Sequence, residues 1–422
     1  MIRDLATFID GRRAGTLSQD RNGRLRYVYD ADYPAEATPL SPRLTVPGGE
    51  YTHADVAPFI AGLLPDNDQV LDRWGRLFGV SPRNAFAILA HVGTDCAGAV
   101  QFVPTDAVAE LDIGNLEALT TSDIAQMLRD LRTDPYTWQQ PAGARGGHFS
   151  LAGAQTKFAL HRTADGWARP SGRIPTTHIF KPAIPGIAHH DLNEHLCLQA
   201  AQRLGLLAAS SELARFDDER VFVVERYDRR RVNGELHRLH QVDMCQALGV
   251  MPDRKYQRDG GPGPADIITT IRSVFAGEAD VDRFVQALVF NWLIAGTDAH
   301  AKNYGLVLSA TNARLAPLYD VASALVTPEW NWHKWELAMR INKQGKFKYL
   351  RIEDWKKFAT SANVDFGVIE TAIAEYSPAL VDVVADAARP MDLDADERAF
   401  AACFTDALAE HISRVVGHRN AE

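Results

Sequence analysis

The fold and chemistry of this 422-residue chain are decided by one segment, Gly296-Thr297-Asp298-Ala299-His300-Ala301-Lys302-Asn303-Tyr304. It directly follows residues 282–295, which are apolar on nearly every side and therefore predict a buried helix. Asp298 and Asn303 stand five positions apart, which is the Asp-x-x-x-x-Asn spacing of a phosphotransfer catalytic loop. In such a loop the aspartate accepts the proton of the attacking hydroxyl, and the asparagine holds a magnesium ion.

A further carboxylate, Asp320, lies seventeen positions beyond Asn303, at the expected end of a strand. Magnesium takes oxygen ligands and keeps water and substrate phosphates in its shell, so Asn303 and Asp320 are the predicted metal ligands. The five-residue spacing alone is a weak signal, because many solvated loops match it. His300, Lys302, the preceding helix and Asp320 together favour a catalytic loop over a polar loop that merely follows a core helix.

Lys181 is a second candidate, because it ends an expected strand at 178–181 and precedes Pro182. A lysine in that position can reach the α- and β-phosphates of ATP. Glu194 opens the next expected helix and is the candidate partner of Lys181. The alternatives are a solvated lysine at a strand end and an acidic residue that merely suits the first turn of a helix.

Small residues between Ser150 and Lys157 form a third candidate feature. Glycine and alanine let backbone amides approach phosphate groups closely. The segment reads Ser150-Leu151-Ala152-Gly153-Ala154-Gln155-Thr156-Lys157, which is neither a Walker A sequence nor a Gly-x-Gly-x-x-Gly loop. Taken alone, it predicts only a glycine turn before a strand.

The composition limits the partners of the chain. With 45 Lys and Arg against 54 Asp and Glu, the net charge is 45 − 54 = −9, which argues against nucleic-acid binding over the whole surface. Residues 334–357 are a basic exception, with eight Lys and Arg against three Asp and Glu, although a solvated face is favoured over a DNA contact. Four widely spaced cysteines, a charged N-terminus and the lack of a long apolar stretch predict a cytoplasmic protein without membrane contact.

Hydrophobic patterns divide the chain into a small β-rich part, a mixed part and a helical part, with expected boundaries at 1–105, 106–235 and 236–422. Asp10-Gly11 predicts the turn between two strands in 7–17, and Asn233-Gly234 predicts a second hairpin. Further strands are expected at 25–29, 93–103, 178–181 and 221–227. Helices are expected at 56–64, 69–79, 121–131, 192–204, 282–295, 368–376, 379–388 and 394–415.

These features together resemble the HipA family of serine/threonine kinase toxins, and the resemblance runs over roughly residues 1–415. It rests on the order and spacing of Ser150 to Lys157, Phe180-Lys181-Pro182, Val224 to Arg229, Gln241 to Gly249, Thr297 to Tyr304 and Tyr319-Asp320. The segments Phe8-Ile9-Asp10-Gly11 and Leu63-Leu64-Pro65-Asp66-Asn67 also look like the small N-terminal part of that family. The resemblance implies a two-lobed, protein-kinase-like α/β (α+β) fold with a β-rich N-terminal subdomain and a helical C-terminal lobe.

The resemblance also implies a role for individual residues. Asp298 is the expected catalytic base, Asn303 and Asp320 the expected magnesium ligands, and Ser150 the expected site of an inactivating autophosphorylation. Tyr227 stands where phenylalanine is expected in the best-known member, a change that backbone recognition of adenine should tolerate. The implied ATP-binding residues are Ala152, Gly153, Ala154, Gln155, Thr156, Lys157, Lys181, Glu225, Tyr227, His300, Lys302, Asn303, Tyr319 and Asp320.

The implied function is ATP- and magnesium-dependent phosphorylation of a protein serine or threonine by the toxin of a toxin–antitoxin pair. The expected partners are a small helix-turn-helix antitoxin, similar to HipB, with its operator DNA, and a substrate in translation such as an aminoacyl-tRNA synthetase. Two alternatives stay open at this point. One is a small-molecule phosphotransferase of the aminoglycoside or choline kind, which shares the same three polar residues. The other is a pseudokinase that acts only with an antitoxin on DNA.

Overall fold

The computed structural model describes residues 4–46, 49–111, 113–134, 150, 153, 155–184, 186–274 and 277–417. The chain divides into two compact units, neither of which is continuous in sequence. The first unit comprises Met1–Ile184, Glu212–Asp253 and Leu306–Ala313. The second comprises Pro185–Ser211, Arg254–Gly305 and Arg314–Glu422.

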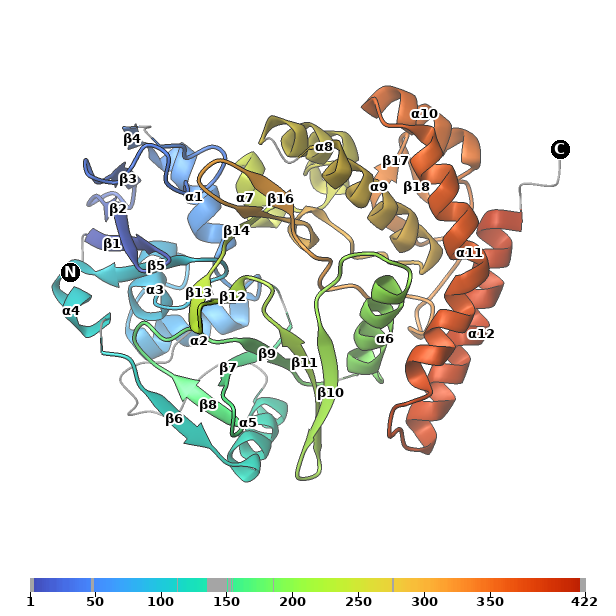
Figure 1. Ribbon diagram of the computed structural model, residues 1–422, viewed down its shortest axis with the longest axis horizontal. Coiled ribbons are helices and arrows are strands. Elements are labelled where there is room, and N and C mark those ends of the chain that lie inside the picture. Colours follow the sequence, from blue (N-terminus) through green and yellow to red (C-terminus); the bar gives the residue numbers. More distant parts are fainter. Residues whose placement is uncertain are drawn as a thin grey trace. The chain divides into compact units, whose positions relative to one another are not determined.

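The first unit begins with a five-stranded sheet in the order β4-β3-β2-β1-β5 (Figure 1). Asp10 and Gly11 both have positive φ, at 46° and 75°, and this confirms the predicted turn between the first two strands. The strands are β1 (Asp4–Ile9), β2 (Arg12–Gln19), β3 (Leu25–Tyr29), β4 (Glu50–Tyr51) and β5 (Val100–Pro104), and the helices beside them are α1 (His53–Gly62), α2 (Asp68–Phe78), α3 (Ala85–Val92) and the short α4 (Val108–Leu111).

The strand predicted at 93–103 is wrong in its first half. Only Val100–Pro104 pairs with β1, and the residues before it form a turn. The reason is that this turn makes bonds outside the sheet: the Gly98 amide donates to the Asp228 carboxylate at 2.6 Å, and Asp95 is buried among arginines. Gly98 has a φ of +79°, a conformation that favours glycine.

A six-stranded sheet forms the rest of the first unit's framework, in the order β10-β11-β9-β7-β8-β6. Its strands are β6 (Leu116–Leu119), β7 (Phe158–Arg162), β8 (Trp167–Pro170), β9 (His178–Lys181), β10 (Ser211–Phe216) and β11 (Glu219–Glu225). The ring of Phe180 packs on those of Phe158 and Trp167, with centroids 4.7 and 4.8 Å away. This aromatic core fixes the central strand β9, which ends at Lys181.

Two smaller sheets and the helix α5 (Thr121–Thr133) are also present, and α5 confirms the helix expected at 121–131. Thr120 and Asp123 form its capping box. The predicted hairpin at Asn233-Gly234 is confirmed as β12 (Arg229–Val232) paired with β13 (Glu235–Arg238). A three-stranded sheet joins β14 (His240–Asp243), β15 (Gly305–Leu308) and β16 (Ala313–Leu315), and α7 (Met244–Leu248) follows β14.

The second unit is mainly helical. The buried helix predicted at 282–295 is confirmed as α9, although it starts earlier, and the long helices α11 and α12 lie side by side (Figure 1). The elements of this unit are α6 (His190–Arg203), α8 (Pro264–Ser273), α9 (Glu278–Leu293), α10 (Ile352–Ala362), α11 (Phe366–Ala388), α12 (Ala395–Gly417) and the hairpin β17 (Glu336–Ile341) with β18 (Gln344–Lys346). No helix in the described ranges is both long enough and apolar enough to cross a membrane.

Two expectations for this region are corrected. The helices predicted at 368–376 and 379–388 are a single helix, α11, which contains Pro378. Proline removes one helical hydrogen bond, but the buried face of α11 continues on both sides of it, from Ile373 and Tyr376 to Leu380. Tertiary packing therefore outweighs the local helix breaker. The C-terminal region is also less purely helical than expected, because β17 and β18 lie inside the basic segment 334–357.

Candidate active site

The predicted catalytic loop leaves α9 through a tight turn that depends on Gly296. A Cβ at that position would lie 2.3 Å from the side-chain oxygen of Asn291, so only glycine fits without a shift. The Gly296 amide donates to the Asn291 carbonyl at 2.7 Å. The Asn291 side chain in turn donates to the hydroxyl of Tyr304 at 3.2 Å. One buried asparagine thus fixes both ends of the loop.

Inside the loop, backbone and side-chain bonds converge on the carbonyl of Asp298. It accepts from the His300 amide at 2.8 Å and from the Asn303 side-chain nitrogen at 2.7 Å. His300 is buried, whereas the Asp298 side chain is 70% exposed. The loop therefore holds its backbone rigidly while it presents the Asp298 carboxylate outward, as a residue that receives a proton from a substrate requires.

The Asp298 carboxylate has two neighbours from its own unit. The hydroxyl of Tyr256 donates to Oδ1 of Asp298 at 2.5 Å, and Nε2 of His300 lies 4.0 Å from the same oxygen. The Tyr256 and His300 rings meet edge to face, with centroids 4.8 Å apart. The structure thus adds a residue to the site that the sequence did not single out.

Asp320 is positioned by the residue before it. The Tyr319 hydroxyl donates to the carbonyl of Lys302 at 2.8 Å, which joins the 319–320 segment to the catalytic loop. Asp320 has a φ of 52°, in the left-handed region that non-glycine residues seldom adopt. On its other side, Asn193 of α6 and Ser323 exchange two hydrogen bonds, of 2.7 and 3.0 Å. Residues on both sides of Asp320 are therefore anchored.

The donor set of this region fits a magnesium ion. The Asn303 nitrogen is used by the Asp298 carbonyl, so the amide oxygen of Asn303 is the atom left for a cation. Asp320 follows Tyr319, whose hydroxyl is bound to the carbonyl of Lys302, the residue before Asn303. One amide oxygen and one carboxylate, with the remaining positions left to water and phosphate, are what magnesium requires.

The predicted phosphate-binding loop lies in the first unit, where Gly153 contacts the N-terminal motif Leu63-Leu64-Pro65-Asp66-Asn67. Gly153 forms a parallel bridge with Pro65, and the Asp66 amide donates to the Gly153 carbonyl at 3.1 Å. Gly153 has a φ of +104°, and a Cβ there would lie 2.7 Å from Nζ of Lys157. Gln155 donates to the carbonyl of Pro182, next to Lys181, at 3.2 Å. Ala152 and Ala154 lie outside the described residues.

Ser150 is fully buried at the start of this loop. Its hydroxyl donates to the Leu63 carbonyl at 2.7 Å, and its amide donates to the Asp95 carbonyl at 2.9 Å. A parallel bridge also links it to Cys96. In this conformation its hydroxyl faces a backbone carbonyl.

Lys181 is also buried, at the end of the central strand β9. Its register partner is Phe222 of β11, and its ammonium lies 5.7 Å from the centroid of that ring. Beyond the end of β11, Glu225 is exposed and Tyr227 is half-buried, while Arg226 between them is buried. The Arg226 side chain therefore points away from the face on which its two neighbours could meet a nucleotide.

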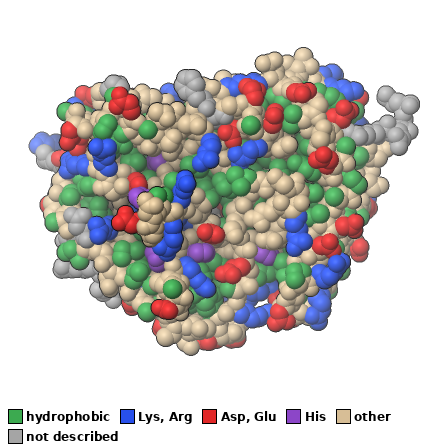
Figure 2. Space-filling model, viewed as in Figure 1, with side chains coloured by type: hydrophobic (Ala, Val, Ile, Leu, Met, Phe, Trp, Pro, Cys, Tyr) green, Lys and Arg blue, Asp and Glu red, His purple; other side chains and the backbone are tan. Residues whose placement is uncertain are grey.

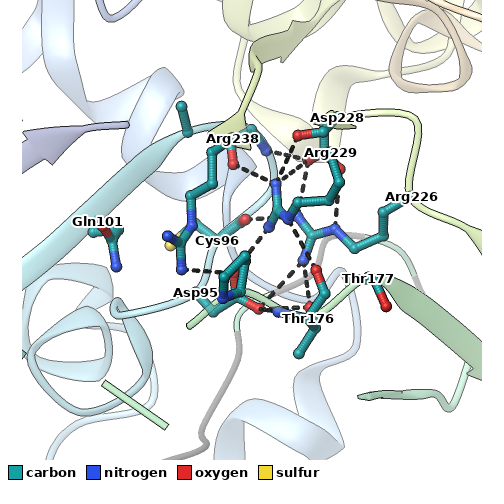
Figure 3. Close-up of polar contacts among 12 residues, drawn as sticks. Asp95, Cys96, Gln101, Thr176, Thr177, Arg226, Asp228, Arg229 and Arg238 are labelled. Carbon is teal, nitrogen blue, oxygen red and sulfur yellow. Dashed lines mark hydrogen bonds and ion pairs between the residues drawn. The ribbon is translucent and has the colours of Figure 1, made fainter. Parts of the chain in front are cut away.

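Arg226 belongs to a buried cluster of ions that the sequence did not reveal (Figure 3). Asp95 lies at its centre: Oδ2 accepts from the amide and hydroxyl of Thr176 and from Arg226, and Oδ1 accepts from Arg229 at 2.9 Å. Arg226 also forms bonds of 3.0 and 2.8 Å with Asp228. The cluster links the 93–99 turn to the segment that follows β11. Its charged members are Asp95, Arg226, Asp228, Arg229 and Arg238.

The arginines of this cluster stabilise the charged forms of its two carboxylates. Burial alone would raise the pKa of Asp95, but the guanidinium groups of Arg226, Arg229 and Arg238 outweigh it, and the pKa lies below its ordinary value. Burial likewise opposes ionisation of Asp228, yet Arg226 and Arg229 lower its pKa to about 2. Both carboxylates are therefore ionised at neutral pH, although neither is exposed to solvent.

The structure corrects the predicted position of Glu194 and adds residues that were not predicted. Glu194 is the fifth residue of α6 and not its first, because the helix starts at His190. Its pairing with Lys181 stays a prediction. Tyr256, Asp95, Asn193 and Asn291 were all missed by sequence reasoning. A local signal existed only for Asn291, because Gly296 stands five positions after it, just past the predicted helix 282–295.

Two protein-family models match this chain. Residues 149–388 match the model of the HipA-like C-terminal domain, and residues 5–103 match that of the HipA N-terminal domain. The chain is 35% identical over 395 residues to the Sinorhizobium fredii protein named "Putative kinase Y4mE", covering 92% of this chain and 91% of that one. It is 28% identical over 406 residues to the serine/threonine-protein kinase toxin HipA of Shewanella oneidensis, covering 92% of this chain and 90% of that one.

A solved structure agrees with these matches over the whole length. It is that of the Shewanella oneidensis toxin–antitoxin system HipA, HipB and its operator DNA complex. The TM-score is 0.85 at 26% identity, over 99% of this chain and 100% of that one. The prediction of a kinase-like α/β fold is thereby confirmed.

Proposed function

The chain belongs to the HipA family of serine/threonine-protein kinase toxins, and from that membership we propose a specific reaction. It transfers the γ-phosphoryl group of ATP to a serine or threonine of a protein in translation, an aminoacyl-tRNA synthetase being the foremost candidate. The observation that supports this most directly is the loop from Asp298 to Asn303, in which Asn303 donates to the Asp298 carbonyl and Tyr319, the neighbour of Asp320, donates to the Lys302 carbonyl.

In this reaction Asp298 orients the attacking hydroxyl and takes its proton, for which its exposed carboxylate is suited. Lys181 neutralises charge on the ATP phosphates, and the loop around Gly153 offers them backbone amides. Magnesium, when bound by Asn303 and Asp320, neutralises charge on the transferring group. The other proposed ATP-binding residues are Ala152, Ala154, Gln155, Thr156, Lys157, Glu225, Tyr227, His300, Lys302 and Tyr319.

We propose that the three parts of the chain, with the boundaries predicted from the sequence, have different roles. Residues 1–105 support the phosphate-binding loop, residues 106–235 carry that loop, Lys181 and the adenine-binding segment, and residues 236–422 carry the catalytic loop. The bonds of Gly153 to Pro65-Asp66 and of Ser150 to Leu63 support the first of these assignments.

The proposed partner is a small helix-turn-helix antitoxin similar to HipB, through which operator DNA is bound in the cytoplasm. The Shewanella oneidensis HipA is known in a complex with HipB and its operator DNA. Basic and acidic side chains are interspersed over the face shown in Figure 2, and the whole chain carries a net charge of −9. An antitoxin that supplies most of the phosphate contacts suits such a surface better than direct DNA binding.

Autophosphorylation of Ser150 is expected to add one phosphate to the wild-type protein during incubation with magnesium and ATP. A phosphate group adds roughly −1.5 to −2 charges, which the Leu63 carbonyl oxygen would repel, so phosphorylated Ser150 must leave its buried position. Intact mass spectrometry measures this gain, with the starting mass taken first. Ser150→Ala should gain nothing yet still form ADP from ATP, whereas Ser122→Ala, which removes an exposed hydroxyl, should behave like wild type.

Two results would contradict this assignment. Continued labelling of Ser150→Ala would place the modified residue elsewhere. A wild-type protein that starts unmodified, gains no phosphate and forms no ADP would contradict the proposed kinase reaction itself.

Loss of the Asp320 carboxylate is expected to weaken nucleotide binding only when magnesium is present. In Asp320→Ala we expect the ATP dissociation constant in magnesium to rise roughly tenfold or more, because even loss of an indirect metal contact often costs that much. Calorimetric titration with and without magnesium measures this difference. Glu410→Ala, which removes an exposed carboxylate on α12, is the control. Equal magnesium dependence in wild type and Asp320→Ala would show that another residue holds the metal.

A further inference from the structure

Tyr256 lies on a rigid turn between α7 and α8, just before a 3-10 helix at Gln257–Asp259. The Tyr256 carbonyl accepts from the amides of Asp259 and Gly261, both at 3.0 Å. Gly261 is required there, because a Cβ would lie 1.9 Å from the Arg254 carbonyl. The backbone that carries Tyr256 is therefore fixed by its own turn.

The same turn is joined to the catalytic loop by two neighbouring residues. The Lys255 carbonyl accepts from the Ala301 amide at 3.4 Å, and the Tyr256 hydroxyl donates to Oδ1 of Asp298 at 2.5 Å. A hydroxyl–carboxylate distance of this size is typical of a strong, charge-assisted hydrogen bond. On its far side, the turn is tied to β17 by the 2.7 Å bond from the Arg340 amide to the Gln257 side chain.

The Tyr256 ring is also held, so its hydroxyl cannot swing freely. The buried ring of His300 meets it edge to face at 4.8 Å. The Arg258 guanidinium lies 4.7 Å from its centroid, and the Lys255 ammonium lies 5.6 Å from it. Cations over a tyrosine face attract the ring. These contacts aim the hydroxyl at one oxygen of Asp298.

We infer that Tyr256 is a positioning residue for phosphoryl transfer, which holds Oδ1 of Asp298 so that Oδ2 faces the substrate hydroxyl. Among the residues that the structure describes, no hydrogen bond reaches Oδ2. The inference rests on the proposed kinase reaction. In the transfer step the substrate hydroxyl proton moves to Oδ2, its oxygen bonds to the γ-phosphorus, and the bond from that phosphorus to ADP breaks. Tyr256 keeps its own proton throughout.

The test compares Tyr256→Phe with wild type, both carrying Ser150→Ala so that the proposed self-inactivation does not end the assay, in ADP formation from magnesium–ATP, a reaction that needs no identified acceptor. Phenylalanine keeps the ring contacts and removes only the hydroxyl. Because hydrogen bonds to charged groups are among the stronger ones, we expect kcat to fall about 10- to 100-fold. The KM for ATP and the thermal midpoint should stay at wild-type values. Tyr349→Phe is the matched control, since Tyr349 is exposed and its ring also lies under a lysine.

Each outcome decides the question. A fall in kcat with unchanged KM and thermal midpoint supports the inference. Wild-type kcat in Tyr256→Phe overturns it and leaves the proposed reaction intact. A raised KM, or a thermal midpoint lowered in step with kcat, also overturns it, because the hydroxyl would then serve nucleotide binding or folding. An inactive, unmodified wild-type protein overturns the proposed reaction and this inference together.

Discussion

Asp298→Ala should lose phosphoryl transfer while it still binds magnesium and ATP. The Asp298 carboxylate is 70% exposed and is not one of the proposed metal ligands, so its loss removes the proton acceptor and leaves the nucleotide contacts in place. A positioned general base typically contributes about 10²- to 10⁴-fold, so ADP formation should fall by at least about 100-fold. Steady-state ADP formation and calorimetric ATP titration, done on the same preparations, measure the two effects separately.

Asp386→Ala is a suitable control for this change, because it removes a partly exposed carboxylate on α11. It should resemble wild type in both measurements. Transfer that persists in Asp298→Ala would remove this residue from the role of base. A variant that loses ATP binding as well would indicate that Asp298 holds the metal, and that the division of roles among Asp298, Asn303 and Asp320 is different.

The loop from Asp298 to Asn303 could be predicted from the sequence because its information is local, while its catalytic role stays a prediction. Asp298 and Asn303 are five residues apart, and the bond between them closes a short turn whose chemistry depends on residue type and spacing. The strand that ends at Lys181 was predicted with its observed limits for a similar reason, since a short apolar run followed by a proline predicts a strand that stops before the proline.

Tyr256 could not be found in this way, since it lies 42 residues before Asp298 in a loop without periodicity. Nothing near Tyr256 in the sequence indicates which carboxylate its hydroxyl will meet. Asp95 was missed for a different reason. It lies in a stretch whose apolar residues suggested a strand, and its partners Thr176, Arg226 and Arg229 come from two distant segments. Buried ion clusters are properties of the tertiary fold, and a single sequence gives no pattern for them.

The buried cluster leads to the largest expected effect on stability. Asp95→Ala removes one of the two carboxylates of the cluster and leaves Asp228, which pairs with Arg226 and Arg229, while Arg238 loses its ion pair with Asp95. Removing one partner of a buried ion pair costs about 3–5 kcal/mol, because the remaining charges stay buried without compensation. The free energy of unfolding of the first unit should fall by that amount. Urea unfolding followed by tryptophan fluorescence measures the change.

An exposed ion pair supplies the control. Arg272 pairs with Glu278, whose side chain is 68% exposed, so Glu278→Ala should have little effect. A destabilisation of Asp95→Ala no larger than that of Glu278→Ala would contradict the proposed importance of the cluster. Because the Asp95 carboxylate also fixes Arg226 between Glu225 and Tyr227, we expect weaker ATP binding in the folded variant. Unchanged ATP affinity would show that the cluster stabilises the fold without positioning the nucleotide.

The pH dependence of stability separates this electrostatic effect from a simple packing defect. The pKa of Asp95 is lowered in the folded protein, and that of Asp228 is lowered to about 2, against an ordinary value of about 3.9 for an unfolded aspartate. A carboxylate with a lowered folded pKa contributes its full stability above the unfolded value and loses it as the pH falls through the folded value. The difference between wild type and Asp95→Ala should therefore be constant from neutral pH to about 5 and shrink below about 4. A difference that does not change down to pH 2 would mean that the alanine variant is destabilised by a cavity, and that the charge of Asp95 matters little.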